Sequence, residues 1–339
     1  MLHIAVDVGS AKSQVCVREP GGEILEEGTW PTARLAERLQ GYAPSRVVLE
    51  TCAEAFAVAE AVKRAGHEVR VVPATLVRTL GVGSRGVKTD KRDARILSEV
   101  SCRIEVPSVH IPSAMARELR MLCTLRDAMV TSRTKLINSV RGYLRGRLIK
   151  LGLGGSKTFH SRVRKKLQGA EEGIPIAVDR LLCAIEQLSI QIEAATQELD
   201  LLAAGDPTCQ RLMTAPGVGT ISALRFFAAI DDIGRFPSHS AVQSYLGLTP
   251  GEHSSSERQR KTSITKAGSA PVRSTLGQAC WCAWRSQPDD PLVHWAKKLA
   301  ERRGRAIAIV AMTRRLVGIL FAIWRDGTRY DPAKVGAKM

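Results

Sequence analysis

Four carboxylates in the first hundred residues have the spacing of a metal site. Asp7 closes the apolar run that begins at Leu2, and Glu50 closes a second apolar run. Asp90 and Asp93 lie three residues apart, which places them on one face of a helical turn. Mg²⁺ prefers carboxylate oxygens as ligands, and metal ions held by carboxylates assist phosphodiester cleavage. The four acids therefore predict a site for a divalent metal ion.

Each of these acids also has a structural explanation when it is taken alone. Asp90 can cap the helix that we expect to begin near Lys91, and Glu50 can be an ordinary polar residue at a strand end. Asp7 is harder to explain in this way, because an acid beside an apolar strand costs free energy unless a cation or hydrogen-bond donors meet it.

A cluster of hydroxyl groups lies far downstream and suggests a second reactive centre. Its serines, Ser254, Ser255 and Ser256, follow His253. Cations that are suited to binding phosphate come next in the chain: Arg258, Arg260, Lys261 and Lys266. Serine is a weak nucleophile until a base or a metal activates it, so the pattern alone equally fits an exposed linker. His253 is a candidate base, although a lone histidine in a polar loop more often has no catalytic role.

The charge of the chain favours a polyanionic partner. Its 339 residues carry a net charge of +17, with an isoelectric point near 9.9. Fourteen Lys or Arg residues lie between Arg117 and Gln168 against only two acids, so we expect a nucleic-acid surface there instead of a merely solvated face. The residues that we expect to bind nucleic acid in this region are Arg133, Lys135, Arg141, Arg145, Arg147, Lys150, Arg162, Arg164, Lys165 and Lys166.

A membrane surface is the competing polyanion. The most apolar stretch, 306–324, is interrupted by Arg314 and Arg315, which argues against a bilayer span. The apolar residues that begin at Leu2 follow no charged leader, so we expect a cytoplasmic protein without a signal peptide. The eight cysteines form no C-x-x-C pair and predict neither a zinc site nor a disulfide framework.

The elements that must position the four acids alternate between strand and helix. The sequence predicts strands over 2–8, 13–18, 23–30, 46–50 and 68–72, with helices over 32–40 and 53–65. This order is that of a ribonuclease H-like domain, whose first and fourth strands lie side by side and would bring Asp7 and Glu50 together. Actin-like sugar kinases share this core and an Asp-x-Gly-Ser turn, but the chain has no second lobe with its own acid and glycine motif.

Helices dominate the rest of the predicted architecture. An apolar residue recurs every seven positions on the basic helix, at Met115, Leu122, Met129, Leu136 and Tyr143. A second heptad seam comprises Val178, Leu181, Ile185, Leu188, Ile192, Ala195, Leu199 and Leu202. These seams predict an antiparallel helical hairpin, a dimer contact, or both. From about Leu212 we expect a compact helical domain, in which the glycine turn at 215–220 binds phosphate or simply starts a helix.

The motifs together resemble the DEDD transposases of the IS110 insertion sequences, which are relatives of the pilin-gene invertases. The resemblance covers essentially the whole chain in order. It is carried by Asp7, by Glu50 within Val-Leu-Glu-Thr, by Lys-Thr-Asp-x-x-Asp-Ala-Arg at 88–95, by Ala-Pro-Gly-Val-Gly at 215–219, by Tyr-Leu-Gly-Leu-Thr-Pro at 245–250 and by Thr-Lys-Ala-Gly at 265–268.

The resemblance implies an α/β plus α fold with three parts. These are a RuvC-like (ribonuclease H-like) DEDD metal-binding domain over 1–106, a basic coiled-coil hairpin over 107–205 and a helical carboxy-terminal transposase domain over 206–339. It also implies a recombinase guided by a structured bridge RNA that pairs with target and donor DNA. The family's nucleophilic serine, five residues after the proline of the Gly-Leu-x-Pro motif, corresponds to Ser255, although Ser256 replaces the glycine that normally follows it.

We therefore expect a bacterial, cytoplasmic and nucleoid-associated recombinase that uses Mg²⁺ and Ser255 and forms a covalent phosphoserine link to DNA. A homo-oligomer, either a dimer or a dimer of dimers, is expected because recombination joins two duplexes. Two other functions stay open on the sequence. One is a RuvC-like junction endonuclease that uses water, and the other is a basic nucleic-acid-binding protein without catalysis.

Overall fold

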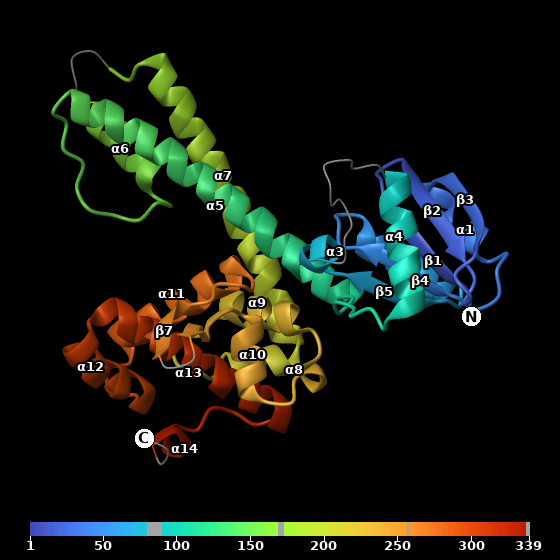
Figure 1. Cartoon of the computed structure of the whole chain (residues 1–339). Helices are drawn as coiled ribbons and strands as arrows, with labels where there is room; N and C mark the ends of the chain where they lie inside the picture. Colours follow the sequence, from blue (N-terminus) through green and yellow to red (C-terminus); the bar gives the residue numbers. More distant parts are fainter. Residues whose placement is uncertain (80–89, 169–172, 256–257, 337–339) are drawn as a thin grey trace. The chain divides into compact units, whose positions relative to one another are not determined.

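The computed structural model describes residues 1–79, 90–168, 173–255 and 258–336, without side chains for 77–79, 253–255, 258–261 and 336. Lys88, Thr89 and Ser256 from the motifs above lie outside the described residues. The chain divides into two compact units, residues 1–112 and 113–339. Figure 1 shows the elements of both units.

A five-stranded mixed sheet forms the centre of the first unit, in the order β3-β2-β1-β4-β5. The central strand β1 runs parallel to β4 and antiparallel to β2. The expectation that the first and fourth strands lie side by side is confirmed, and the order is compatible with a ribonuclease H-like domain. The strands are β1 (His3–Asp7), β2 (Lys12–Arg18), β3 (Ile24–Pro31), β4 (Arg46–Glu50) and β5 (Glu68–Val72).

Helices cover both faces of this sheet, which explains why its central strands are nearly continuous apolar runs. Successive side chains of a strand point to opposite faces. Ile4 and Val6 pack on the face covered by α1 (Leu35–Leu39) and α2 (Ala55–Arg64). Ala5 packs on the opposite face, against α4 (Asp90–Arg103). The short elements η1 (Thr32–Arg34) and α3 (Ala74–Thr79) complete the unit.

A long antiparallel helical hairpin, here called the arm, projects from the second unit. It consists of α5 (Ala114–Gly146) and α7 (Ile176–Gly205), with α6 (Phe159–Leu167) packed at its distal end (Figure 1). The distal end has its own apolar core of three helices, in which Leu144, Phe159 and Leu182 are fully or almost fully buried. The predicted hairpin is therefore confirmed.

The apolar seam of α5 differs from the one expected. Met115 is 60% exposed, whereas Ala116, Leu119, Cys123, Ile137, Val140 and Leu144 are buried. On α7 the expected Val178, Ile185, Ile192 and Leu199 are buried, but the other half of the seam is shifted by one residue to Leu182, Ser189 and Ala203. Ile185 and Ile192 thus form the interior of the hairpin.

A polar layer interrupts this interior and accounts for the shifted seam. Arg126 Nε donates a 2.8 Å hydrogen bond to Thr196 Oγ1, and Arg133 Nη1 donates a 3.3 Å hydrogen bond to Ser189 Oγ. Burial and then the charge of Arg126 lower the pKa of Arg133. Arginines thus take inward positions that an apolar pattern assigns to other residues.

The rest of the second unit is a helical body that shares one core with the base of the arm. Leu119 of α5 and Leu199 of α7 belong to the same apolar cluster as Phe226 and Leu316. The elements of the body are α8 (Pro207–Leu212), α9 (Thr220–Ile230), η2 (Ile233–Arg235), α10 (His239–Tyr245), α11 (Ala270–Ser286), α12 (Pro291–Arg303), α13 (Arg305–Asp326) and α14 (Pro332–Gly336).

Helix α13 is long and apolar enough to cross a membrane, and half of its most apolar window is buried within the protein. Its residues Met312, Leu316 and Leu320 are fully buried in the core of the body, among the other helices. In this structure α13 is therefore a central core helix.

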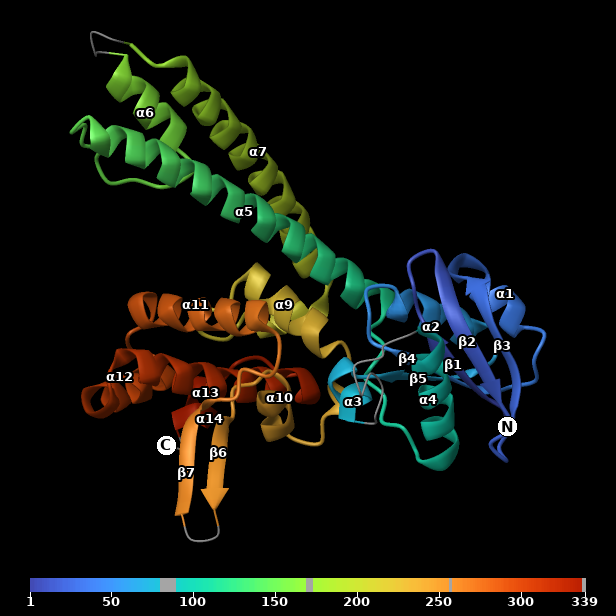
Figure 2. The same ribbon diagram turned by 45° about the horizontal axis from the view of Figure 1, so that its top comes forward.

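A two-stranded hairpin leaves the body between α10 and α11, where only helix and loop were expected. Its strands are β6 (Pro250–Ser255) and β7 (Arg258–Ile264). Figure 2 shows them as a ribbon beside the helices of the body.

Candidate active site and nucleic-acid interface

Two predicted metal ligands lie side by side at the carboxyl ends of β1 and β4. The parallel register pairs Ala5 with Val48 and Val6 with Leu49, so Asp7 and Glu50 form the next step of the same ladder. Ala5 and Val48 both belong to the cluster beneath α4. Because side chains alternate along a strand, Asp7 and Glu50 lie on this same face.

Helix α4 runs antiparallel to β1 and brings its own acids to the same end. His3 Nδ1 lies 2.8 Å from Ser101 Oγ, and Leu97 packs in the cluster with Ala5. From Ala5 to Asp7 the strand advances about 6.6 Å. From Leu97 back to Asp93 the helix advances about 6 Å in the same direction. Asp93 is therefore expected to lie near Asp7. Asp90, the first residue of α4, is exposed one turn earlier on the same side of the helix.

Asp93 is the most informative residue of this group. The residue is only 6% exposed, and among the described residues no hydrogen-bond donor meets its Oδ1. A buried carboxylate oxygen without a donor is costly, and a hard cation would satisfy it. Within the described residues no three acidic, histidine or cysteine side chains gather closely enough to form a ready metal site. The carboxylate oxygens of Asp7, Glu50 and Asp93 are donors of the type that Mg²⁺ prefers, but the described side chains do not meet as a formed site.

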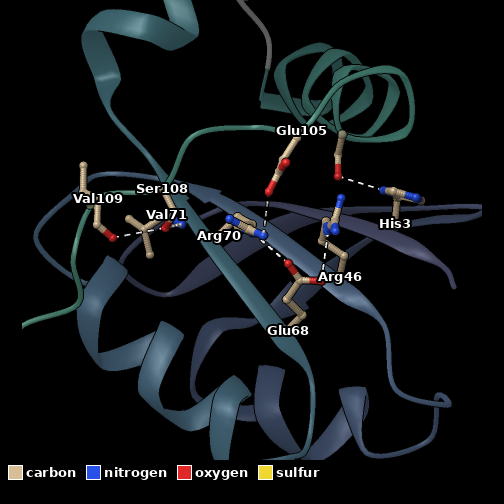
Figure 3. Close-up of polar contacts among 9 residues, drawn as sticks. His3, Arg46, Glu68, Arg70, Val71, Glu105, Ser108 and Val109 are labelled. Atoms are coloured by element: carbon tan, nitrogen blue, oxygen red, sulfur yellow. Dashed lines mark hydrogen bonds and ion pairs between the residues drawn. The ribbon is translucent and has the colours of Figure 1, made fainter. Parts of the chain in front are cut away.

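The amino end of the same sheet face is built differently. Here the register places His3, Arg46 and Glu68 in one row. Arg46 and Arg70 both bind the Glu68 carboxylate, at 3.1 and 2.7 Å, and Arg70 also reaches Glu105 at 3.2 Å (Figure 3). Burial would raise the pKa of Glu68, but the hydrogen bonds from Arg70 and Arg46 outweigh burial and lower it. This end is a closed structural network.

Ion pairs on the outer strand fix the orientation of α4. Lys91 and Arg95 both bind Glu27 of β3, Lys91 at 3.4 Å, and the bond from Arg95 lowers the Glu27 pKa. On the neighbouring strand, Arg18 Nε donates to Ser98 Oγ at 3.1 Å. These contacts hold one side of α4 over β2 and β3, which leaves the side with Asp93 over β1 and β4.

The candidate nucleophile lies at the end of the polar hairpin. Ser255 is the last residue of β6, and its backbone pairs with Arg258 of β7. Ser254 pairs with Gln259, and His253 pairs with Arg260, so Ser255 is the serine that lies opposite a cation in this ladder. The side chains of Ser255, Arg258, Arg260 and Lys261 lie outside the described residues, whereas Lys266 is exposed at the base.

The base of this hairpin is held by close backbone contacts between two of the sequence motifs. Thr265 N donates to Thr249 O at 2.9 Å, and Lys266 N donates to Gly247 O at 3.0 Å. Gly247 has a φ of +68°, and a Cβ there would lie 2.6 Å from Ala267 N. A Cβ on Gly268 would lie 2.1 Å from Tyr245 O. Both glycines are therefore needed for packing, and they anchor the hairpin in the body.

The other glycine motif is explained by packing as well. Gly217 has a φ of +70°, and a Cβ there would lie 2.0 Å from Ala279 O of α11. This contact favours the structural interpretation of the turn at 215–220 over phosphate binding. A cavity of about 580 Å³ opens nearby in the body, between α5, α9 and the start of α11, and it is lined by Arg120, Arg225, Tyr245 and Gly268.

The predicted nucleic-acid residues of the arm fall into two groups. Three of them are engaged in the fold. Arg164 bonds to Asp179 and Glu186, Arg162 donates to the carbonyl groups of Gly152 and Gly155, and Arg133 bonds to Ser189. The exposed group comprises Lys135, Arg141, Arg145, Arg147, Lys150, Lys165 and Lys166. Within it, Arg141 and Arg147 stack over Phe159 and Tyr143 and keep their charge at the surface.

Two family models match separate parts of the chain. Residues 4–148 match a transposase model of the DEDD type named for IS110, and residues 209–293 match the model "Transposase IS116/IS110/IS902 family". The first match spans the sheet, α4 and all of α5, and the second spans the hairpin that carries Ser255.

Similar proteins are transposases of insertion sequences. The transposase for insertion sequence element IS1111A of Coxiella burnetii is 26% identical, over 98% of this chain and 92% of its own length. The transposase for insertion sequence element IS1328 of Yersinia enterocolitica is 25% identical, over 97% of this chain and 98% of its own length. A probable family 20 transposase of Pseudomonas aeruginosa is 26% identical over 85% of this chain.

Proposed function

Because the chain belongs to the IS110 family of insertion-sequence transposases, we propose that it is a DNA recombinase that cleaves and exchanges strands through Ser255 and a Mg²⁺ site. Asp7, Glu50, Asp90 and Asp93 would hold the metal ion. The observation that carries this proposal is the buried Asp93 Oδ1, which no described residue hydrogen-bonds, beside the sheet edge that Asp7 and Glu50 share. When bound, the cation would offset the negative charge that builds on the phosphoryl oxygens.

The residues of this chain would perform a two-step transfer. Ser255 Oγ attacks the scissile phosphorus and loses its proton to solvent or to a nearby base. The new oxygen–phosphorus bond forms as the bond to the departing deoxyribose oxygen breaks, and the departing strand leaves as a hydroxyl. A hydroxyl end of the exchanged strand then attacks the phosphoserine, which restores a phosphodiester and the free serine. Arg258, Arg260, Lys261 and Lys266 would bind the flanking phosphates.

The arm would bind the nucleic-acid partners. We propose that they are target DNA, donor DNA and a structured bridge RNA, within the bacterial cytoplasm at the nucleoid. The exposed cations of α5 and α6 support this proposal, because no acid of the arm bonds to Arg145 or Lys150 among the described ion pairs. Phosphate contacts from such residues give strong, salt-dependent affinity without reading sequence.

A covalent adduct distinguishes this function from its alternatives. A denaturant-resistant link between protein and DNA should form with the unchanged protein and disappear in Ser255→Ala. Ser254→Ala is the matched control and should keep the link. Cleavage without any adduct would instead support a water-using junction endonuclease. Binding without cleavage would support the non-catalytic alternative.

A composite site in an oligomer is a further part of the proposal. The acids belong to the first unit and the serine to the second, so each unit supplies only half of the chemistry. Mixed oligomers of Asp7→Asn and Ser255→Ala should then recover some cleavage, because one combination of units stays intact. If exchanging subunits recover none, the site forms within one chain.

A further inference from the structure

The distal end of α5 contains a leucine in a backbone conformation that favours glycine. Leu148 has a φ of +58°. Ile149 N donates to Leu144 O at 2.9 Å, and Leu148 N donates to Arg145 O at 3.0 Å. These two bonds form a Schellman motif with Leu148 at its left-handed position, where glycine is usual because it has no Cβ. A leucine there costs free energy that a glycine would not.

Packing within the protein does not offset this cost. The Leu148 side chain is 90% exposed, whereas the next residue, Ile149, packs on the distal core of the arm. Two other non-glycine residues of the described chain, Asp231 and Lys266, also have positive φ. The Asp231 carboxylate accepts a hydrogen bond from Ser113 N, and Lys266 N ties the base of the β6–β7 hairpin to Gly247.

The segment around Leu148, here called the tip, has exposed apolar and basic side chains close together in sequence. Leu153, in the same α5–α6 connection, is fully exposed. Arg162 holds this connection in place by donating to Gly152 O at 2.7 Å and Gly155 O at 3.1 Å. Arg145, Arg147 and Lys150 are exposed beside the leucines in sequence, and the Arg147 guanidinium lies 4.8 Å from the centre of the Tyr143 ring.

The chemistry of this tip selects its partner. A second copy of the tip would bring like charges together, and the acids Asp179 and Glu186 at this end of the arm are already paired with Arg164. Exposed leucines flanked by cations match a nucleic acid with an unstacked base, because an apolar side chain can pack on the base while the cations bind its phosphates.

We propose that Leu148, assisted by Leu153, is an apolar wedge that packs against an unstacked base of a bound nucleic acid, and that Arg145, Arg147 and Lys150 bind the flanking phosphates. This inference rests on the nucleic-acid binding of the proposed function and adds a specific contact to it. The wedge recognises a loop, bulge or frayed end in preference to a continuous duplex.

Leu148→Gly tests the wedge, because folding and binding should change in opposite directions. Glycine relieves the backbone strain, so the melting temperature should rise or stay the same. Affinity for a stem-loop RNA with 2-aminopurine in its loop should fall about tenfold, which is at the lower end of what burying one leucine side chain contributes. Affinity for a fully paired duplex of equal length, and the salt slope for both probes, should not change.

Leu201→Ala is the matched control, since Leu201 is 75% exposed on α7 at the other end of the arm. It should leave binding of both probes unchanged. Equal stem-loop affinity of Leu148→Gly and the unchanged protein would overturn the wedge, as would equal losses for stem-loop and duplex. Loss of binding to phosphatidylserine vesicles alone would also overturn it, in favour of a membrane contact. The phosphoserine adduct is measured separately, so its presence or absence tests the proposed function and not the wedge.

Discussion

The two ends of one sheet face use charge in opposite ways. At the amino end, Arg46 and Arg70 close an ion-pair network around Glu68. At the carboxyl end, a later row of the same face contains Asp7 and Glu50, and α4 adds Asp93, whose buried Oδ1 meets no donor within the described part of the chain. The same helix covers both rows. On this sheet face, the amino end pairs its charged groups with one another, whereas the carboxyl end holds the acids to which we assign chemistry.

The arm divides its arginines in the same manner. Arg164 is paired with Asp179 and Glu186, and the bond to Glu186 is the main reason that its pKa is raised. Arg145 lies exposed on the basic helix. Sequence composition counts both as equal positive charges, although only the exposed one is available to a phosphate.

The largest expected effect is that of Asp7→Asn at the carboxyl end. Cleavage should fall by about a thousandfold or more, comparable with the upper range for removing one group that stabilises transition-state charge. DNA and RNA affinity should stay nearly unchanged, because no phosphate contact is removed. His3→Asn is the matched change at the other end of β1, where it should lower thermal stability and spare cleavage. Robust cleavage by Asp7→Asn would remove the distinction between the two ends.

Asp93→Asn should separate activity from stability. We expect about a hundredfold loss of cleavage. The free energy of unfolding should stay the same or rise by about 1 kcal/mol, because a buried charge without a full set of partners is removed. Urea unfolding and a cleavage assay on one preparation measure both quantities. A clear loss of stability with normal cleavage would assign Asp93 to the fold, like Glu68.

The division of the arm predicts a smaller effect on binding. Arg145→Gln with Lys150→Gln should flatten the dependence of log affinity on log salt by almost two, at about 0.9 for each lost contact with duplex DNA. Arg164→Gln should instead lower the melting temperature and leave the slope unchanged. Binding affinity measured from low to high salt distinguishes these outcomes. If only Arg164→Gln changed the slope, Arg164 and not Arg145 or Lys150 would be the phosphate-binding residue.

Glu68→Gln should show the smallest effect and a characteristic pH dependence. The Glu68 pKa lies below its ordinary value of 4.5 in the folded protein, so its ion pairs stabilise the fold above that pH. The side chain is one third exposed, and solvent screening limits the loss at pH 7 to about 1 kcal/mol or less. The difference between Glu68→Gln and the unchanged protein should disappear as pH falls through the folded pKa. The free energy of unfolding of both proteins, measured at pH 7 and near pH 3, tests this. If the difference between the two proteins is the same at both pH values, the Glu68 ion pairs are not its cause.

Local patterns were sufficient to predict most of the first unit. The apolar runs that end at Asp7 and Glu50 became β1 and β4, because each run is short, apolar and bounded by turn residues. The order of the elements predicted that β1 and β4 lie side by side. The same order predicted that two acids meet at one edge of the sheet. The orphaned oxygen of Asp93 was not predictable, since it depends on how α4 is oriented by the contacts of Lys91 and Arg95 with Glu27.

The sequence by itself determined the strands, the helical arm and the identity of the acids, because these depend on residue type and on periods of 2 and 3.5 that are local properties of the chain. Only the tertiary structure decided which arginines face inward, as Arg133 does toward Ser189. It also decided that the polar segments around Ser255 pair as strands. Backbone hydrogen bonds form this ladder, and the side chains have no alternating apolar pattern from which the strands could be predicted. The left-handed backbone conformation of Leu148 was also decided by the tertiary structure, because the hydrogen bonds that end α5 set it and the leucine side chain does not.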